Sequence, residues 1–189
     1  EGTIETWFVY GSSGDVALFS EAGEAVNRAY DAGGVVLDQN GSYVWRKEKQ
    51  HVRNQIMAIE GASATEERDA LAVCLDTVLA YEGVTRSTQP LLDQGFTVAE
   101  ILKENISNVQ VLDLEDCCLE SILYYPDREI PVLATLEDGN AVLIVGFNEQ
   151  NVVIMNPENG QVYKVGMNDA TEWLEENGNM FVTYVKGID

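Results

Sequence analysis

The sequence predicts an α+β fold in which a long central helix packs on an antiparallel sheet. Helix-capping patterns lie upstream, and strand patterns separated by tight turns follow between residues 130 and 185. The chain has 189 residues, 46% hydrophobic and 23% charged, which are values typical of a globular protein with one main domain. We expect three parts: a small α/β appendage over residues 1–46, a basic connector over 47–62 and the main domain over 63–189.

The appendage is expected to hold two strands, a helix and a hairpin. In order, the predicted elements are strands at 7–10 and 16–19, a helix capped by Ser20 and ended by Gly33-Gly34, and a hairpin at 34–38 and 42–45 across Asn40-Gly41. The glycines near residue 11 match no phosphate-binding loop pattern and are predicted to form a turn.

The connector region is unusually basic. Four of the eleven basic residues of the chain lie in it or directly before it, near the only histidine, His51; they are Arg46, Lys47, Lys49 and Arg53. Either this segment is solvated and lies against the acidic body, or it is a docking patch for an acidic partner. His51 is expected to be a surface residue.

The main domain is expected to open with its longest helix. Ser63 and Glu66 have the spacing of a capping box, and an apolar repeat continues towards Gly83. The helix is therefore predicted from about Ala64 to Tyr81. The later predicted elements are a helix opened by Thr97 and Glu100, a strand at 108–112, a helix at 119–125 capped by Asp116 and stopped by Pro126, a helix capped by Asn168 and stopped by Gly178, and a strand at 179–185.

Between these helices, the stretch 130–165 reads as three strands joined by turns at Asp138-Gly139 and at an asparagine-rich segment. The sequence of this stretch resembles that of the C39-like (bacteriocin-processing-like) cysteine peptidases, a branch of the papain-like fold. In that family the second strand opens with a catalytic histidine, in a pattern like GHAVLIVGY, and an Asp-Pro pair follows the third strand. Asn140 and Asn156 stand at the histidine and aspartate positions.

Residues 69–83, DALAVCLDTVLAYEG, resemble the nucleophile helix of the same family, DCGLACLAMVLNYYG. The resemblance spans roughly 63–185 and places Ala70 at the nucleophile, with Cys74 one turn later. The family's oxyanion glutamine, about six residues before the nucleophile, is replaced by Ala64, and Gln55 lies too far along the chain to serve. The resemblance thus implies the fold, while all four functional positions depart from it.

These departures remove what a cysteine peptidase needs, because alanine has no nucleophile and asparagine carries no proton near neutral pH. We expect no catalytic residue, and a non-catalytic domain that binds a peptide or protein within a bacterial secreted or surface protein. An engineered Ala70 would not explain Asn140, so natural loss is the better account. The alternatives are an active cysteine peptidase or acyltransferase that uses Cys74, and a purely structural spacer.

Two geometric expectations follow from the resemblance. Ala70, Asn140 and Asn156 should line one cleft, with Cα separations of ~6–10 Å. Because the predicted helix starts near Ala64, position 70 should lie well inside it, beyond the reach of the helix dipole, and a thiol there should keep an ordinary pKa. The double variant Ala70→Cys with Asn140→His is therefore expected to lack peptidase activity.

The charge balance is strongly acidic, with 32 Asp and Glu against 11 Lys and Arg and a net charge of −21. This excludes nucleic acid and anionic membrane surfaces as partners. It fits solubility, salt adaptation or a basic peptide or protein partner. The three cysteines, Cys74, Cys117 and Cys118, have no zinc-site spacing, so no metal or cofactor is expected. Cys74 is expected to be buried, and the neighbouring pair to be free rather than a strained disulfide.

No run of about 18 apolar residues predicts a membrane-spanning helix, and no signal peptide pattern is present. The chain starts at Glu1 rather than at a methionine, which indicates either a trimmed product or an excised piece of a longer protein that lacks its leader or anchor. We expect the protein to act outside the cell or at its surface. The sequence indicates neither the ligand nor the oligomeric state.

Overall fold

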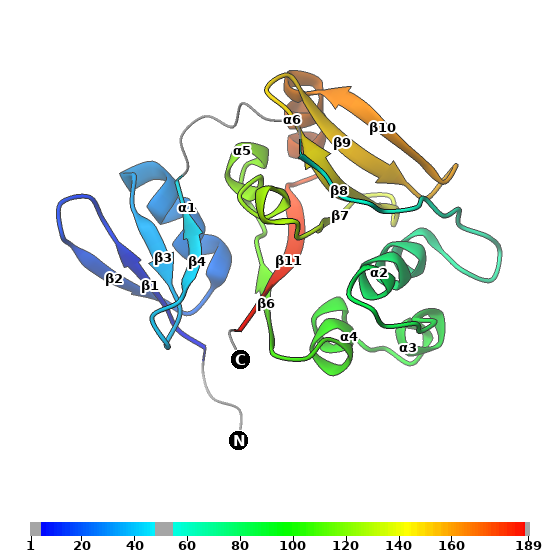
Figure 1. Cartoon of the computed structure of the whole chain (residues 1–189), viewed down its shortest axis with the longest axis horizontal. Coiled ribbons are helices and arrows are strands. Elements are labelled where there is room, and N and C mark those ends of the chain that lie inside the picture. Colours follow the sequence, from blue (N-terminus) through cyan, green and yellow to red (C-terminus); the bar gives the residue numbers. More distant parts are fainter. Residues whose placement is uncertain (1–4, 48–54, 188–189) are drawn as a thin grey trace.

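The structure is a computed structural model that describes residues 5–47 and 55–187. It contains a four-stranded sheet near the N-terminus and a seven-stranded sheet in the rest of the chain (Figure 1). We call residues 5–47 the N-terminal module and residues 55–187 the body. His51, Lys49 and Arg53 lie outside the described residues.

The module contains a helix packed on one face of its sheet. Its elements are β1 Trp7–Tyr10, β2 Val16–Phe19, α1 Ala22–Ala32, β3 Val35–Leu37 and β4 Tyr43–Arg46. The strand order is β2-β1-β3-β4 and all pairs are antiparallel. Gly33 ends α1 in the left-handed region, as predicted, but the N-cap is Glu21 rather than Ser20.

The body carries the larger sheet and five of the six α-helices that the described residues form. Its elements are β5 Gln55–Ile56, α2 Ala70–Tyr81, α3 Gln89–Asp93, α4 Val98–Asn105, β6 Val109–Asp113, α5 Leu119–Ile122, the 3₁₀ turn η1 Pro126–Arg128, β7 Val132–Thr135, β8 Ala141–Phe147, β9 Asn151–Asn156, β10 Gln161–Gly166, α6 Met167–Glu176 and β11 Met180–Lys186. The order β10-β9-β8-β7-β11-β6 is antiparallel throughout, and β5 pairs with the end of β8. The predicted α+β class is confirmed.

The body sheet is buried on both faces. Leu143 and Val145 of β8 pack in a cluster with residues of α2, α3 and α4, whereas Val142 and Ile144 pack in a second cluster with residues of α1, α5 and α6. Burial on both sides explains why β8 reads as an unbroken apolar run in the sequence.

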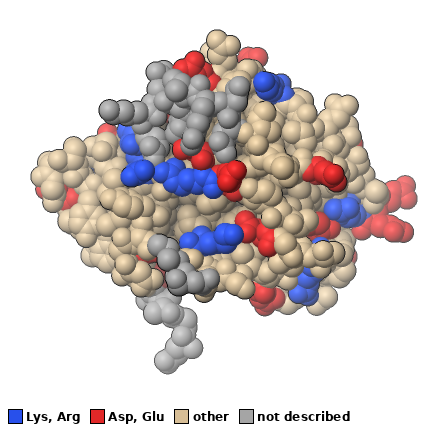
Figure 2. All heavy atoms as spheres, in the orientation of Figure 1, with Lys and Arg blue, Asp and Glu red and all other residues tan. Residues whose placement is uncertain are grey.

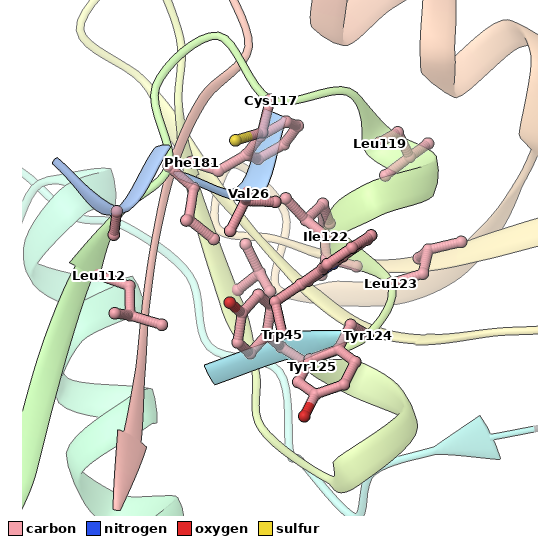
Figure 3. Packing of buried hydrophobic residues seen from close by; sticks show 14 of the residues in the cluster. Val26, Trp45, Leu112, Cys117, Leu119, Ile122, Leu123, Tyr124, Tyr125 and Phe181 are labelled. Atoms are coloured by element: carbon pink, nitrogen blue, oxygen red, sulfur yellow. The ribbon is translucent and has the colours of Figure 1, made fainter. Parts of the chain in front are cut away.

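The second cluster is shared between the module and the body (Figure 3). Trp45 of the module is almost fully buried, and its indole N–H donates to the Ser121 carbonyl at 2.8 Å. In the other direction, the Tyr125 hydroxyl donates to the Val44 carbonyl at 3.0 Å. The two parts therefore share one packed core rather than meeting at a polar surface.

The central helix α2 begins at Ala70, so the predicted start near Ala64 is wrong. Ser63 does not cap a helix: the Ala64 N–H instead donates to the Pro157 carbonyl at 2.7 Å, and the Thr65 N–H donates to the Arg68 carbonyl at 2.8 Å. These contacts hold the preceding residues in a turn, and Asp69 becomes the N-cap.

Two other predicted caps are also wrong, whereas the capping box of Thr97 and Glu100 is confirmed. Asp116 lies in the left-handed region with φ 68°, and α5 starts only after Cys118. Asn168 lies inside α6 rather than capping it: the helix starts after Gly166, where the Met167 N–H donates to the Gln150 carbonyl at 2.8 Å.

Two further boundaries differ from the prediction. The predicted helix at 119–125 ends at Ile122, and Pro126 opens the turn η1 instead of only stopping a helix. Residues 55–56 of the predicted connector form β5, and Met57 is buried under α2. Among the described residues, no helix has the length and apolar character needed to cross a membrane.

Candidate functional site

The N-terminus of α2 is where the resemblance places the nucleophile, and Ala70 is its first helical residue. The Asp69 side chain accepts a hydrogen bond from the Ala72 N–H at 2.9 Å. Gln89 clamps Asp69 from α3: its side-chain oxygen accepts from the Asp69 N–H at 2.9 Å, and its amide nitrogen donates to the Asp69 carboxylate at 3.3 Å. Gln89 was not singled out from the sequence, since its partner is 20 residues away.

Asn140 and Asn156 lie at the ends of neighbouring strands. Asn140 directly precedes β8, and Asn156 is the last residue of β9. Extending the register by one step from the pair Leu143 and Met155 sets Asn156 opposite Val142. Both asparagines are half-buried, and the structure therefore brings them to the same edge of the sheet.

Ala64, at the oxyanion position, lies beside this edge. Its N–H donates to the carbonyl of Pro157, the residue that follows Asn156. Nearby, a Cβ at position 61 would clash with the Gly160 carbonyl oxygen, so only a glycine allows the chain to pass this close to the turn after β9. The segment before α2 is thus fixed against the end of β9.

The side chains of the two asparagines make local contacts. The Asn140 side-chain oxygen accepts from the Ala141 N–H at 3.0 Å, and that of Asn156 accepts from the Glu158 N–H at 3.0 Å. By strand alternation both positions share the sheet face of Val142, whereas α2 packs on the face of Leu143. The shared cleft expected for Ala70, Asn140 and Asn156 stays a prediction.

Cys74 is fully buried in the cluster beneath α2, as expected. Burial raises the pKa of its thiol well above the ordinary value, because the apolar surroundings disfavour the thiolate. Burial likewise raises the pKa of Cys117 to about 12, with nearby negative charges adding to the effect. All three cysteines are free, and Cys118 is the most accessible of them.

The surface of the described residues is hollowed beside α2 and between the module and the body. The first cavity, of about 750 Å³, runs along α2 between residues 58–62 and 84–87. The second, of about 640 Å³, lies between the module and the body. Ala70, Asn140 and Asn156 line neither of them. The described residues contain no group of three or more His, Cys, Asp or Glu side chains placed to hold a metal ion.

No protein-family model and no curated protein matches the sequence. Two solved structures are similar to the chain in three dimensions. The chain shares the fold of C39-like peptidases. One neighbour is a candidate C39-like peptidase from Bacillus anthracis, with a TM-score of 0.61 and 15% identity over 72% of this chain and 100% of that one.

The other neighbour is a double-glycine motif protease from an AMS/PCAT transporter, solved in complex with the leader peptide. Its TM-score is 0.52 with 16% identity, and the match covers 74% of this chain and 100% of that one. Both neighbours are therefore matched over their whole lengths, while about a quarter of this chain extends beyond them.

Proposed function

We propose that this chain is a non-catalytic domain of C39-like fold that binds a peptide or protein, within a bacterial secreted or cell-surface protein. The observation that carries the proposal is the residue at the start of α2. Ala70 occupies the first helical position, where a thiol would gain most from the unpaired N–H groups, and it has no sulfur.

The other catalytic positions support the same proposal. Asparagines stand where the family's histidine and aspartate would activate and orient the nucleophile, and the chain's one histidine is His51, far upstream of that position. Peptide binding is favoured because one structural neighbour is a protease in complex with a leader peptide.

The use of Cys74 as an alternative nucleophile is disfavoured by its environment. Its side chain is fully buried among apolar residues, and desolvation raises its pKa. A thiol of that kind is almost wholly protonated at neutral pH and is closed to a substrate.

A pool of random dodecamer peptides tests the proposal directly. Panning the pool against the immobilised chain should enrich a recurring sequence pattern, and mass spectrometry of the same pool after incubation should show no cleavage. Cleavage that iodoacetamide abolishes would identify an active cysteine peptidase instead. If no sequence pattern is enriched, the result favours the alternative that the chain is a purely structural spacer.

A further inference from the structure

The cavity between the module and the body has the dimensions of a ligand site. Its volume of about 640 Å³ is within the usual range for pockets that bind small ligands or short peptide segments. Its lining comes from five segments, which are α1, β4 with the residue after it, α5 with its flanking residues, the end of β8 with the turn after it, and α6. The lining residues are Tyr30, Trp45, Arg46, Lys47, Cys118, Glu120, Ser121, Leu123, Tyr124, Phe147, Asn148, Glu149, Met167, Asn168 and Thr171.

The two walls of this cavity are held in fixed relation. The Tyr30 hydroxyl of the module donates to the Glu120 carboxylate of the body at 2.6 Å. Beneath it, the hydrogen bond between Trp45 and the Ser121 carbonyl and the shared core join the same two parts. The cavity is therefore formed before any ligand arrives, which lowers the entropic cost of binding.

The floor and the rim differ in chemistry. Trp45, Leu123 and Phe147 are buried residues that give the floor its apolar character. On the module side of the rim, the Lys47 ammonium lies over the Tyr30 ring, 5.0 Å from its centroid. On the body side, exposed Glu149 lies in the turn after β8.

Basic side chains are scarce in this chain, yet several gather near the centre of the face shown in Figure 2, beside acidic ones. Among the described residues that line the cavity, two are basic (Arg46 and Lys47) and two are acidic (Glu120 and Glu149), although the whole chain carries −21. A ligand with both a positive and a negative group fits this arrangement better than one with either alone.

The module supplies one complete wall. It makes up about a quarter of the chain. The cavity thus depends on the module, and Ala70, Asn140 and Asn156 do not line it.

We propose that this cavity binds a peptide segment in which an apolar side chain lies between a basic and an acidic one. The apolar side chain rests on the floor, the acidic group pairs with Lys47 and the basic group pairs with Glu149. This inference rests on the proposed peptide-binding function and assigns it a place and a sequence preference.

The probe is the capped tripeptide acetyl-Lys-Phe-Glu-amide, with binding measured by isothermal titration calorimetry on the full chain. Replacing its phenylalanine by alanine should weaken binding. The variant Lys47→Glu should bind it up to about fivefold more weakly, as expected for an exposed ion pair, and should instead prefer acetyl-Lys-Phe-Lys-amide. Lys164→Glu on exposed β10 is the matched control and should leave both affinities unchanged.

A steric pair of variants tests the location independently of charge. Thr171→Trp fills the cavity from α6 and should abolish binding, whereas Glu172→Trp, one residue away and outside the cavity lining, should not. Glu149→Lys should weaken binding of the probe, and circular dichroism confirms that each variant is folded.

The outcomes separate this inference from the proposed function. If peptides enriched from the dodecamer pool bind Thr171→Trp, Lys47→Glu and Glu149→Lys as well as they bind the natural chain, the chain binds peptides elsewhere and the cavity assignment is wrong. If only the variant Ala70→Trp fails to bind those peptides, the peptides bind at the start of α2, where the resemblance places the nucleophile. If neither the tripeptide probes nor any dodecamer of the pool binds the natural chain, the proposed function itself fails.

Discussion

The carboxylate of Asp69 accepts a hydrogen bond from the Ala72 N–H at 2.9 Å, and this contact sets position 70 at the first turn of α2. Unpaired N–H groups and the positive end of the helix dipole act there. The sequence-based expectation of an ordinary thiol pKa at position 70 rested on a helix start near Ala64, and the observed start at Ala70 removes that reason.

We therefore predict that Ala70→Cys has a thiol pKa below the usual value of about 8.5. In a Cys118→Ser background, its second-order rate with iodoacetamide at pH 7 should exceed that of Ala80→Cys, an exposed position in the last turn of the same helix, where the dipole opposes the thiolate. Adding Asp69→Asn keeps a capping side chain and removes a negative charge, so it should raise the rate further. Equal rates at positions 70 and 80 would contradict the prediction.

A reactive thiol alone should not restore hydrolysis. We predict that Ala70→Cys with Asn140→His cleaves no peptide in the dodecamer pool, because the position of the family's oxyanion glutamine still holds an alanine, Ala64. The expected outcome matches the sequence-based one, but for a different reason. Cleavage above the level of Ala70→Cys alone, seen by mass spectrometry, would show that hydrolysis proceeds without that glutamine.

Substitutions at the predicted cap, Ser63, and at the observed cap, Asp69, should affect the stability of the protein differently. Asp69→Ala removes the cap and should lower the free energy of unfolding by about 1 kcal/mol. Ser63→Ala should change it by less than about 0.5 kcal/mol, because Ser63 caps no helix. Urea unfolding measures both, and a larger effect at Ser63 would contradict the observed start of α2.

The contrast between these residues shows what the sequence could predict. Strands and turns in 130–165 were predictable, because signals such as Asp138-Gly139 act within a few residues and Gly139 does take φ 82°. The start of α2 was not, since it depends on the bond between Ala64 and Pro157 and on the clamp from Gln89. Ser63 and Asp69 are both suitable N-caps by residue type, and the contacts with residues distant in the sequence determine that the helix starts after Asp69.

The candidate site divides in the same way. Asn140 and Asn156 could be assigned to strand ends from the sequence, since strand and turn patterns bracket them. The cavity between the module and the body could not, because its walls come from five separate segments. No pattern within Arg46-Lys47 or Glu149 reveals that these charges line one cavity.

Buried thiols give the stability of the chain a definite dependence on pH. Burial raises the pKa of Cys117 from 9.0 to about 12 in the folded state, so the unfolded chain loses this proton first as the pH rises. The stabilisation is complete below pH 9 and is lost progressively between pH 9 and 12. We predict a smaller loss of stability over that interval in Cys117→Ala, measured by urea unfolding, with Cys118→Ala as the control. An unchanged slope in Cys117→Ala would show that this thiol does not titrate as a buried group.

The last prediction concerns the joint between the module and the body. Trp45 is almost fully buried at this joint, where it packs against Tyr30 and Tyr124 and donates to the Ser121 carbonyl. Trp45→Ala should cost about 3–5 kcal/mol, the range for large-to-small core substitutions. Trp45→Phe keeps most of the volume and should cost less, about 1–3 kcal/mol, for the carbonyl left unpaired.

Because the core is continuous across the joint, the natural chain should unfold in one cooperative transition, with the same urea midpoint by circular dichroism and by tryptophan fluorescence. Exposed Tyr43 on the same strand is the matched control, and Tyr43→Ala should leave that midpoint nearly unchanged. Two separate transitions in the natural chain would show that the module folds on its own. In that case the cavity wall it supplies would not be held in place, and the preformed peptide site would lose its physical basis.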